Sequence, residues 1–174
     1  MKKTVWMVVM AGLLFGACTY STKSRPDDFY LVLDWSTGAL PPKYHYAYQV
    51  EIGPQPKGKV TYEHGYSSEE NRQAWVKEFS LTSSDLDTLY KLISEKRMLR
   101  SNWAEGQMLL GGKSTAIKIF ASGTVFEIPS ISVLGKADRK NIETVIDAIR
   151  STVPQSIWDE MAVLQTENEA KFED

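Results

Sequence analysis

Polar and apolar side chains alternate most regularly between residues 44 and 52. One face of this segment would carry Tyr44, Tyr46, Tyr48, Val50 and Ile52. A period of two is typical of a strand with one buried face. A segment rich in glycine and proline, 53–58, predicts a turn, and the alternating residues 60–66 predict the returning strand of a hairpin.

The register of this hairpin is predicted by keeping apolar side chains on one face. We expect Ile52 to face Val60, because a slip of one residue would set polar side chains against apolar ones. The same register places Tyr48 opposite His64. Two further strands are predicted on either side, one over Phe29–Trp35 and one carrying Trp75, Phe79 and Leu81.

A second hairpin is predicted around the dipeptide Ser122-Gly123, which is typical of a two-residue turn. The pairs would be Ile119 with Phe126 and Ile117 with Ile128 on one face, and Lys118 with Glu127 on the other. Opposite charges that face each other across two strands support this register. The two predicted hairpins repeat at an offset of 65 residues, Gly58 matching Gly123. A duplicated β-hairpin–helix unit and a chance recurrence of a common motif both remain open.

Helices are predicted after each hairpin by apolar residues at a period near 3.6. Thr82-Ser83-Ser84-Asp85 is a capping box and begins a helix at about 82–97, and Pro154 ends a second one at about 138–153. A last helical stretch carries Ile157, Met161 and Leu164. Together these elements predict an α+β fold, an antiparallel sheet of hairpins with the two main helices packed on one face.

Composition predicts one globular domain at 29–165, preceded by a polar tether at 18–28 and followed by an acidic tail at 166–174. Removal of residues 1–17 leaves 18 basic and 22 acidic residues, a net charge of −4. This balance argues against a nucleic-acid partner and against electrostatic binding to anionic lipid. No cysteine follows Cys18, so we expect neither a disulfide nor thiol catalysis in the domain.

The sequence motifs that could indicate a catalytic or cofactor site are weak. The glycine turn at 110–115 resembles a phosphate-binding loop, but Gln107 stands where the first glycine belongs and a strand is predicted to follow. His45 and His64 would lie on opposite faces of the first hairpin, and no nucleophile elbow is present. The acid pairs Asp27-Asp28 and Glu69-Glu70 are typical of solvated loops. We therefore expect no catalytic residue, no cofactor and no metal site.

Tyrosines are the remaining candidate for a binding surface. Tyr44, Tyr46, Tyr48, Tyr62 and Tyr66 could form a platform that stacks on sugars or on a partner chain. They could equally pack beneath the helices with their hydroxyls at the rim, because tyrosine tolerates partial burial. The sequence favours the core.

The N-terminus carries the most specific motif. Lys2 and Lys3 precede the apolar residues 5–15, and Gly16 and Ala17 then lead to Cys18. The sequence Phe15-Gly16-Ala17-Cys18 resembles the lipobox of bacterial lipoproteins, although Phe15 stands where leucine is usual. The fourteen apolar residues from Val5 to Cys18 fall short of the ~20 needed to span a bilayer. An ordinary secretory signal remains an alternative.

This resemblance implies cleavage between Ala17 and Cys18, and a diacylglyceryl thioether with an N-acyl chain on Cys18. Thr19, in place of aspartate, resembles the outer-membrane sorting pattern of Gram-negative lipoproteins. The implied location is the cell envelope, with the domain facing the periplasm in a Gram-negative cell. The globular part loosely resembles small uncharacterised α+β domains of bacterial lipoproteins.

The sequence therefore favours a membrane-anchored, non-catalytic binding module. Its expected partners are the membrane, through acylated Cys18, and another envelope protein or a cell-wall component. Two alternatives stay open. One is an inhibitor of a secreted enzyme that uses the 53–58 loop, and the other is a hydrolase with an unrecognised site.

Overall fold

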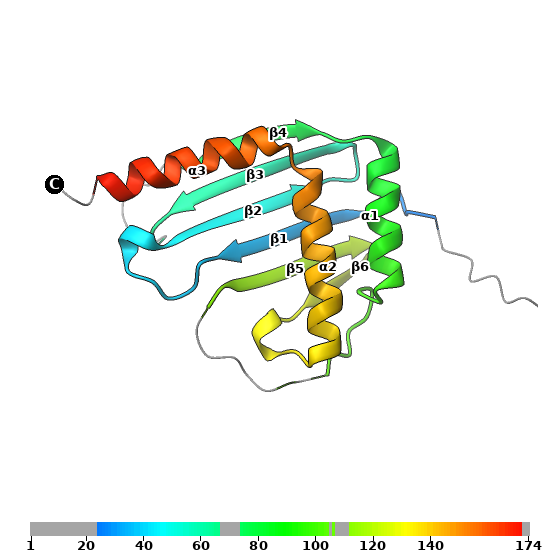
Figure 1. The fold of residues 1–174 in the computed structure, drawn as a ribbon. Coiled ribbons are helices and arrows are strands. Elements are labelled where there is room, and N and C mark those ends of the chain that lie inside the picture. The colour runs from blue at the N-terminus through cyan, green and yellow to red at the C-terminus, as the bar shows by residue number, and fades with distance from the viewer. Residues whose placement is uncertain (1–23, 67–73, 105, 107–111, 172–174) are drawn as a thin grey trace, which may run out of the picture.

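A computed structural model describes residues 24–66, 74–104, 106 and 112–171. The strands are β1 (Tyr30–Ser36), β2 (Tyr46–Ile52), β3 (Lys57–His64), β4 (Trp75–Ser80), β5 (Ser114–Ala121) and β6 (Thr124–Ile128). The helices are α1 (Ser83–Glu95), α2 (Lys136–Thr152) and α3 (Gln155–Ala170), with two short 3-10 turns, η1 (Pro42–Tyr44) and η2 (Ile131–Val133). All six strands form one open antiparallel sheet, and the three α-helices lie on one of its faces (Figure 1). The predicted α+β class is confirmed.

The strand order is β4-β3-β2-β1-β5-β6, so the two hairpins lie on opposite sides of β1. The predicted register of the second hairpin is confirmed, with Ile117 opposite Ile128 and Ile119 opposite Phe126. Ser122 and Gly123 both have positive φ, 53° and 72°, as a tight hairpin turn requires. This turn matches the right-handed twist of the strands that it joins.

The predicted register of the first hairpin is wrong by two residues. Val60 faces Val50, and Ile52 faces Gly58. Gly58 lies within β3 because the ring of Phe79, its partner on β4, occupies the space where a side chain would be. The turn is therefore shorter than predicted, and it closes with a hydrogen bond of 3.1 Å from the Gly53 amide to the Lys57 carbonyl.

The helices begin as predicted and cover an aliphatic core. Thr82 and Asp85 form the capping box of α1, each side chain accepting a hydrogen bond from the other's amide. α2 ends at Thr152, and after Val153 the chain bends at Pro154 into α3. α3 continues to Ala170 and so includes residues 166–170 of the acidic tail. The buried core unites the sheet with all three helices, including Leu31, Leu33, Val50, Ile117, Leu86, Ile93, Ile142, Ile149 and Ile157.

The sheet has two ends that differ in character. The turn end holds the β2–β3 and β5–β6 turns and the start of β1, and the chain enters there (Figure 1). The far end holds the end of β1 and the starts of β2 and β5. At the far end Tyr44 was predicted to belong to β2, but it lies in η1 and is 47% exposed. Pro41 and Pro42 cause this, because their fixed φ favours a helical turn over a sheet ladder.

Candidate functional site

A row of aromatic side chains crosses four strands near the far end of the sheet. The row consists of Trp35, Tyr48, Tyr62 and Trp75, each opposite the next on neighbouring strands. It lies on the face that carries the helices, and the rings of Trp35 and Tyr48 stack with centroids 4.9 Å apart. The core is therefore aromatic at the far end, and it also holds the buried rings of Phe29, Phe79 and Tyr90 towards the turn end. Tyr48 and Tyr62 are buried, as the sequence favoured for the tyrosines.

α2 and α3 leave a hollow beside this row. α2 crosses the strands, whereas α3 runs along β3, and the two helices meet at Pro154 (Figure 1). The hollow measures about 860 Å³, which lies within the ~300–1,000 Å³ of small-molecule sites. Its lining includes Tyr46 from β2, Arg150 and Ser151 from α2, and Trp158, Met161 and Gln165 from α3. We call it the α2–α3 groove.

The groove places one cation against its aromatic lining. The Arg150 guanidinium lies 5.6 Å from the ring centroid of Trp158, a cation–π distance. The Trp158 indole N–H donates a hydrogen bond of 3.2 Å to the Arg150 carbonyl, so backbone and side chain both hold the pair together. Trp158 also contacts Tyr48 edge-on, with centroids 5.2 Å apart. The groove is therefore continuous with the aromatic row.

The groove tyrosines are hydrogen-bond donors at neutral pH. Burial raises the pKa of Tyr48 to about 12, against the opposing charge of Arg150. Burial also raises the pKa of Tyr46, which lies at the groove surface. Among the described residues, the buried Tyr48 hydroxyl has no hydrogen-bond partner. A buried hydroxyl without a partner lowers the stability of the fold. The Tyr48 hydroxyl thus adds an unpaired polar group below the aromatic rings.

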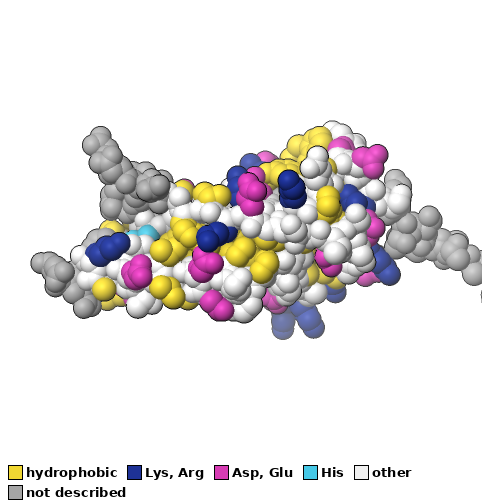
Figure 2. Space-filling model, turned by 90° about the horizontal axis from the view of Figure 1, so that it is seen from above, with side chains coloured by type: hydrophobic (Ala, Val, Ile, Leu, Met, Phe, Trp, Pro, Cys, Tyr) yellow, Lys and Arg dark blue, Asp and Glu magenta, His cyan; other side chains and the backbone are white. Residues whose placement is uncertain are grey.

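The two tryptophans of the aromatic row also have cations near their rings. The Lys113 ammonium lies 5.6 Å from the Trp35 ring centroid, and the Lys77 ammonium lies 5.6 Å from that of Trp75. Lys77 is also ion-paired with Glu160 of α3, at 2.7 Å. Acidic and basic side chains are interspersed with hydrophobic ones on the face seen from above (Figure 2).

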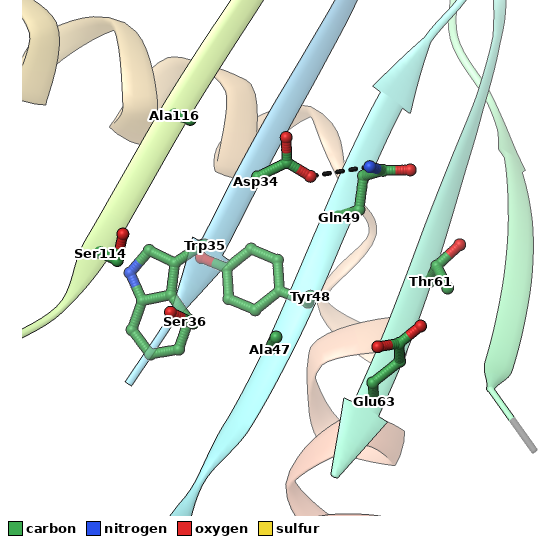
Figure 3. A pocket seen from close by; sticks show the side chains of 10 residues that line it. All are labelled: Asp34, Trp35, Ser36, Ala47, Tyr48, Gln49, Thr61, Glu63, Ser114 and Ala116. Atoms are coloured by element: carbon green, nitrogen blue, oxygen red, sulfur yellow. Dashed lines mark hydrogen bonds between the residues drawn. The ribbon is translucent and has the colours of Figure 1, made fainter. Parts of the chain in front are cut away.

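The opposite face of the sheet carries a second, smaller depression, of about 250 Å³, also at the far end (Figure 3). Its floor is formed by small side chains of β1, β2 and β5. Ser36 faces both Ala47 and Ser114, and Ala116 faces Asp34. Asp34, Gln49, Thr61 and Glu63 surround this floor. The Gln49 amide donates a hydrogen bond of 2.7 Å to Asp34. Trp35 and Tyr48 also line the depression, which has two carboxylates but no cation among its lining residues.

The structure separates the two histidines. His45 lies before β2, where its Nδ1 donates a hydrogen bond of 2.8 Å to the Gly38 carbonyl and its ring stacks on Tyr66 at 3.9 Å. His64 ends β3 and faces Tyr46. Across the described part of the chain, no three histidine, cysteine or acidic side chains lie close enough to hold a metal ion. His45 is a packed structural residue.

Some predicted residues lie outside the described ones, namely Ala17, Cys18 and Glu69-Glu70. Gln107 and residues 110–111 of the glycine turn are also outside them. After Gly112 and Lys113 the chain enters β5, as predicted, and not a helix that could bind phosphate at its N-terminus. Within the described ranges, no helix is both long and apolar enough to cross a membrane.

The groove itself was not predicted. Arg150 and Trp158 stand on different helices and form no spacing motif, and Trp35 was taken as the end of an apolar strand. The one available signal was the set of tyrosines, of which Tyr46 lines the groove. The sequence matches no protein-family model, and the search of curated proteins found no match.

Proposed function

We propose that this chain is a lipid-anchored envelope protein that binds a ligand, without catalysis, in the α2–α3 groove. The observation that carries the proposal is the meeting of an aromatic surface and the Arg150 guanidinium in a hollow, whose lining also includes the carboxylate of Asp147. Among the described residues, Arg150 has no carboxylate within ion-pair distance, and its guanidinium rests on Trp158. Structural surface arginines commonly pair with acids, so a free guanidinium on an aromatic face suits ligand recognition.

In this proposal the membrane anchor is the acylated Cys18. One acyl chain of myristoyl size gives marginal membrane binding, whereas two or three chains hold a protein at the lipid. A mildly acidic domain would not add electrostatic attraction to anionic lipid, so acylation carries the attachment. In a Gram-negative cell this places the domain at the outer membrane, facing the periplasm.

The lining favours a cell-wall carbohydrate as the ligand. The flat faces of Tyr46 and Trp158 suit the C–H faces of sugar rings, and Arg150 suits a carboxylate or acetamido oxygen. The side-chain amide of Gln165 donates a hydrogen bond of 2.9 Å to Glu169, which leaves its oxygen as an acceptor for the ligand. Strand addition by a protein partner is less favoured, because both edge strands carry charges that oppose pairing, Lys77 and Glu78 on β4 and Glu127 on β6.

Crosslinking in growing cells tests the groove. A photo-crosslinking side chain at Gln165, which lines the groove, should capture cell-wall material, and one at the exposed Val125 of β6 should not. Trp158→Ala and Arg150→Met should abolish the adduct at Gln165. Val163→Ala is the matched control on α3, because Val163 is 56% exposed.

Three results would refute parts of the proposal. Equal capture from Val125, or capture that survives both groove substitutions, would overturn the groove as the binding site. Capture of a protein in place of carbohydrate would overturn the ligand class. Unchanged fatty-acid labelling of a Cys18→Ala variant would overturn the anchor.

A further inference from the structure

The segment before β1 is fastened to the turn end of the sheet at two points. The Arg25 guanidinium forms an ion pair of 2.8 Å with Asp87 of α1, and it donates a hydrogen bond of 3.4 Å to the carbonyl of Pro54 in the β2–β3 turn. Asp28 accepts hydrogen bonds of 2.8 and 2.6 Å from the amides of Ser122 and Gly123 in the β5–β6 turn. These contacts join parts of the chain that lie 29 to 95 residues apart.

The Asp28 contact holds a charge in a defined place. Two successive amides of a turn with positive φ form a concave donor site that suits a carboxylate. The hydrogen bonds from Gly123 and Ser122 lower the pKa of Asp28 below its ordinary value. The carboxylate is therefore ionised at neutral pH, and the segment is fixed against both hairpin turns.

Chain length then limits where the membrane can be. Six residues lead from Cys18 to Ser24, the first described residue, and they reach at most about 22 Å even when extended. The seven residues of β1 separate the turn end from the far end by roughly 20 Å more. An anchor at Cys18 thus keeps the turn end close to the lipid.

The chemistry of the turn end fits contact with lipid headgroups. Its two tips, residues 53–56 and 122–123, carry no charged side chain. Arg25 is paired with Asp87, and the Asp28 carboxylate is bound to amides. The tips themselves therefore add no repulsion from anionic lipids, and the exposed carboxylates of Asp27 and Asp85 beside them are offset in part by the exposed Lys57.

We infer that the turn end faces the membrane and rests against the lipid headgroups, so that the α2–α3 groove and the depression on the open face point away from it. This orientation rests on the acylation of Cys18 proposed above. It places both recessed surfaces of the far end where envelope material can reach them.

Fluorescence quenching in vesicles tests the orientation with the full acylated chain. Cys18 is the only cysteine, so once it is acylated an introduced cysteine is the single free thiol. Gln55→Cys places a fluorophore at the turn end, and Leu40→Cys places one at the far end, where Leu40 is 42% exposed. The vesicles contain lipids with nitroxide-labelled headgroups as the quencher.

We expect the label at position 55 to be quenched about twofold more strongly than the label at position 40, since the strand length separates them. Adding Arg25→Ala and Asp28→Asn should reduce this difference. Equal quenching of an acylated protein, or stronger quenching at position 40, would overturn the orientation and leave the anchor and the groove standing. A chain that carries no acyl group and does not float with the vesicles would overturn the anchor and, with it, the orientation.

Discussion

Gly58→Ala tests the contact with Phe79 that fixes the register of β3 against β4. A Cβ built on Gly58 would lie 2.2 Å from Cζ of Phe79 and 2.6 Å from its two Cε atoms. Phe79 is only 7% exposed, so its ring cannot swing into solvent without loss of burial. Forcing a methyl group into such a site typically costs ~1–3 kcal/mol. We expect a loss of about 2 kcal/mol, or ~4–8 °C in Tm for a domain of this size.

Urea and thermal unfolding measure this loss, and a double-mutant cycle assigns it. Phe79→Ala alone should cost ~3–5 kcal/mol, because it removes a buried ring. In that background Gly58→Ala should be neutral or stabilise by about 0.5 kcal/mol, since the clash is gone and the unfolded chain loses freedom. Gly53→Ala is the matched control, because its Cβ would meet nothing closer than 3.8 Å. Additive costs at Gly58 and Phe79, or a harmless Gly58→Ala, would refute the reasoning.

Three further substitutions test the capping box of α1, the buried Tyr48 hydroxyl and the hydrogen bonds of Asp28 to the β5–β6 turn. Thr82→Ala should lower the free energy of unfolding by about 1 kcal/mol in urea titration, because it removes the side-chain acceptor for the Asp85 amide; no loss would contradict the cap. Tyr48→Phe should leave that free energy unchanged or raise it by about 1 kcal/mol, and a clear loss would reveal a hydrogen-bond partner. The pKa of Asp28 is lowered by folding, so its stabilisation is complete above its unfolded pKa and is lost as pH falls through the folded value. Asp28→Asn should therefore differ most from the wild type near neutral pH and converge with it in acid, with Asp27→Asn as control; a gap that is independent of pH would contradict this.

Local chemistry made much of the fold predictable. The capping box at Thr82 and the turn at Ser122-Gly123 each depend on residues within a few positions of one another, so the sequence displays them directly. The covered face of each strand was predictable for a similar reason, because alternation identifies it without knowledge of the partner. The end of α2 was equally local, since Pro154 cannot continue a helix.

The groove was not predictable, because its parts meet only through packing. Arg150 reaches Trp158 since the chain bends at Pro154, and the angle of that bend depends on how α3 lies along β3. Helix propensity and periodicity predict α2 and α3, but they do not predict the direction in which α3 runs. A groove between two helices produces no periodic pattern in the sequence, so pattern analysis cannot predict it.

The wrong register of the first hairpin has a similar cause, since sequence pattern does not specify which residues of two strands face each other. Alternation has a period of two, so a shift by two residues leaves every side chain on its face and cannot be detected from pattern. The shift nevertheless changes every cross-strand neighbour. Under the predicted pairing Tyr48 would face His64, whereas in the structure it faces Tyr62, and only then does an unbroken aromatic row reach Trp35. The contact of Gly58 with Phe79 acts on the other side of β3, where it fixes β3 against β4 and so keeps Tyr62 opposite Trp75; the outer part of the aromatic row at the far end thus depends on a glycine at the turn end.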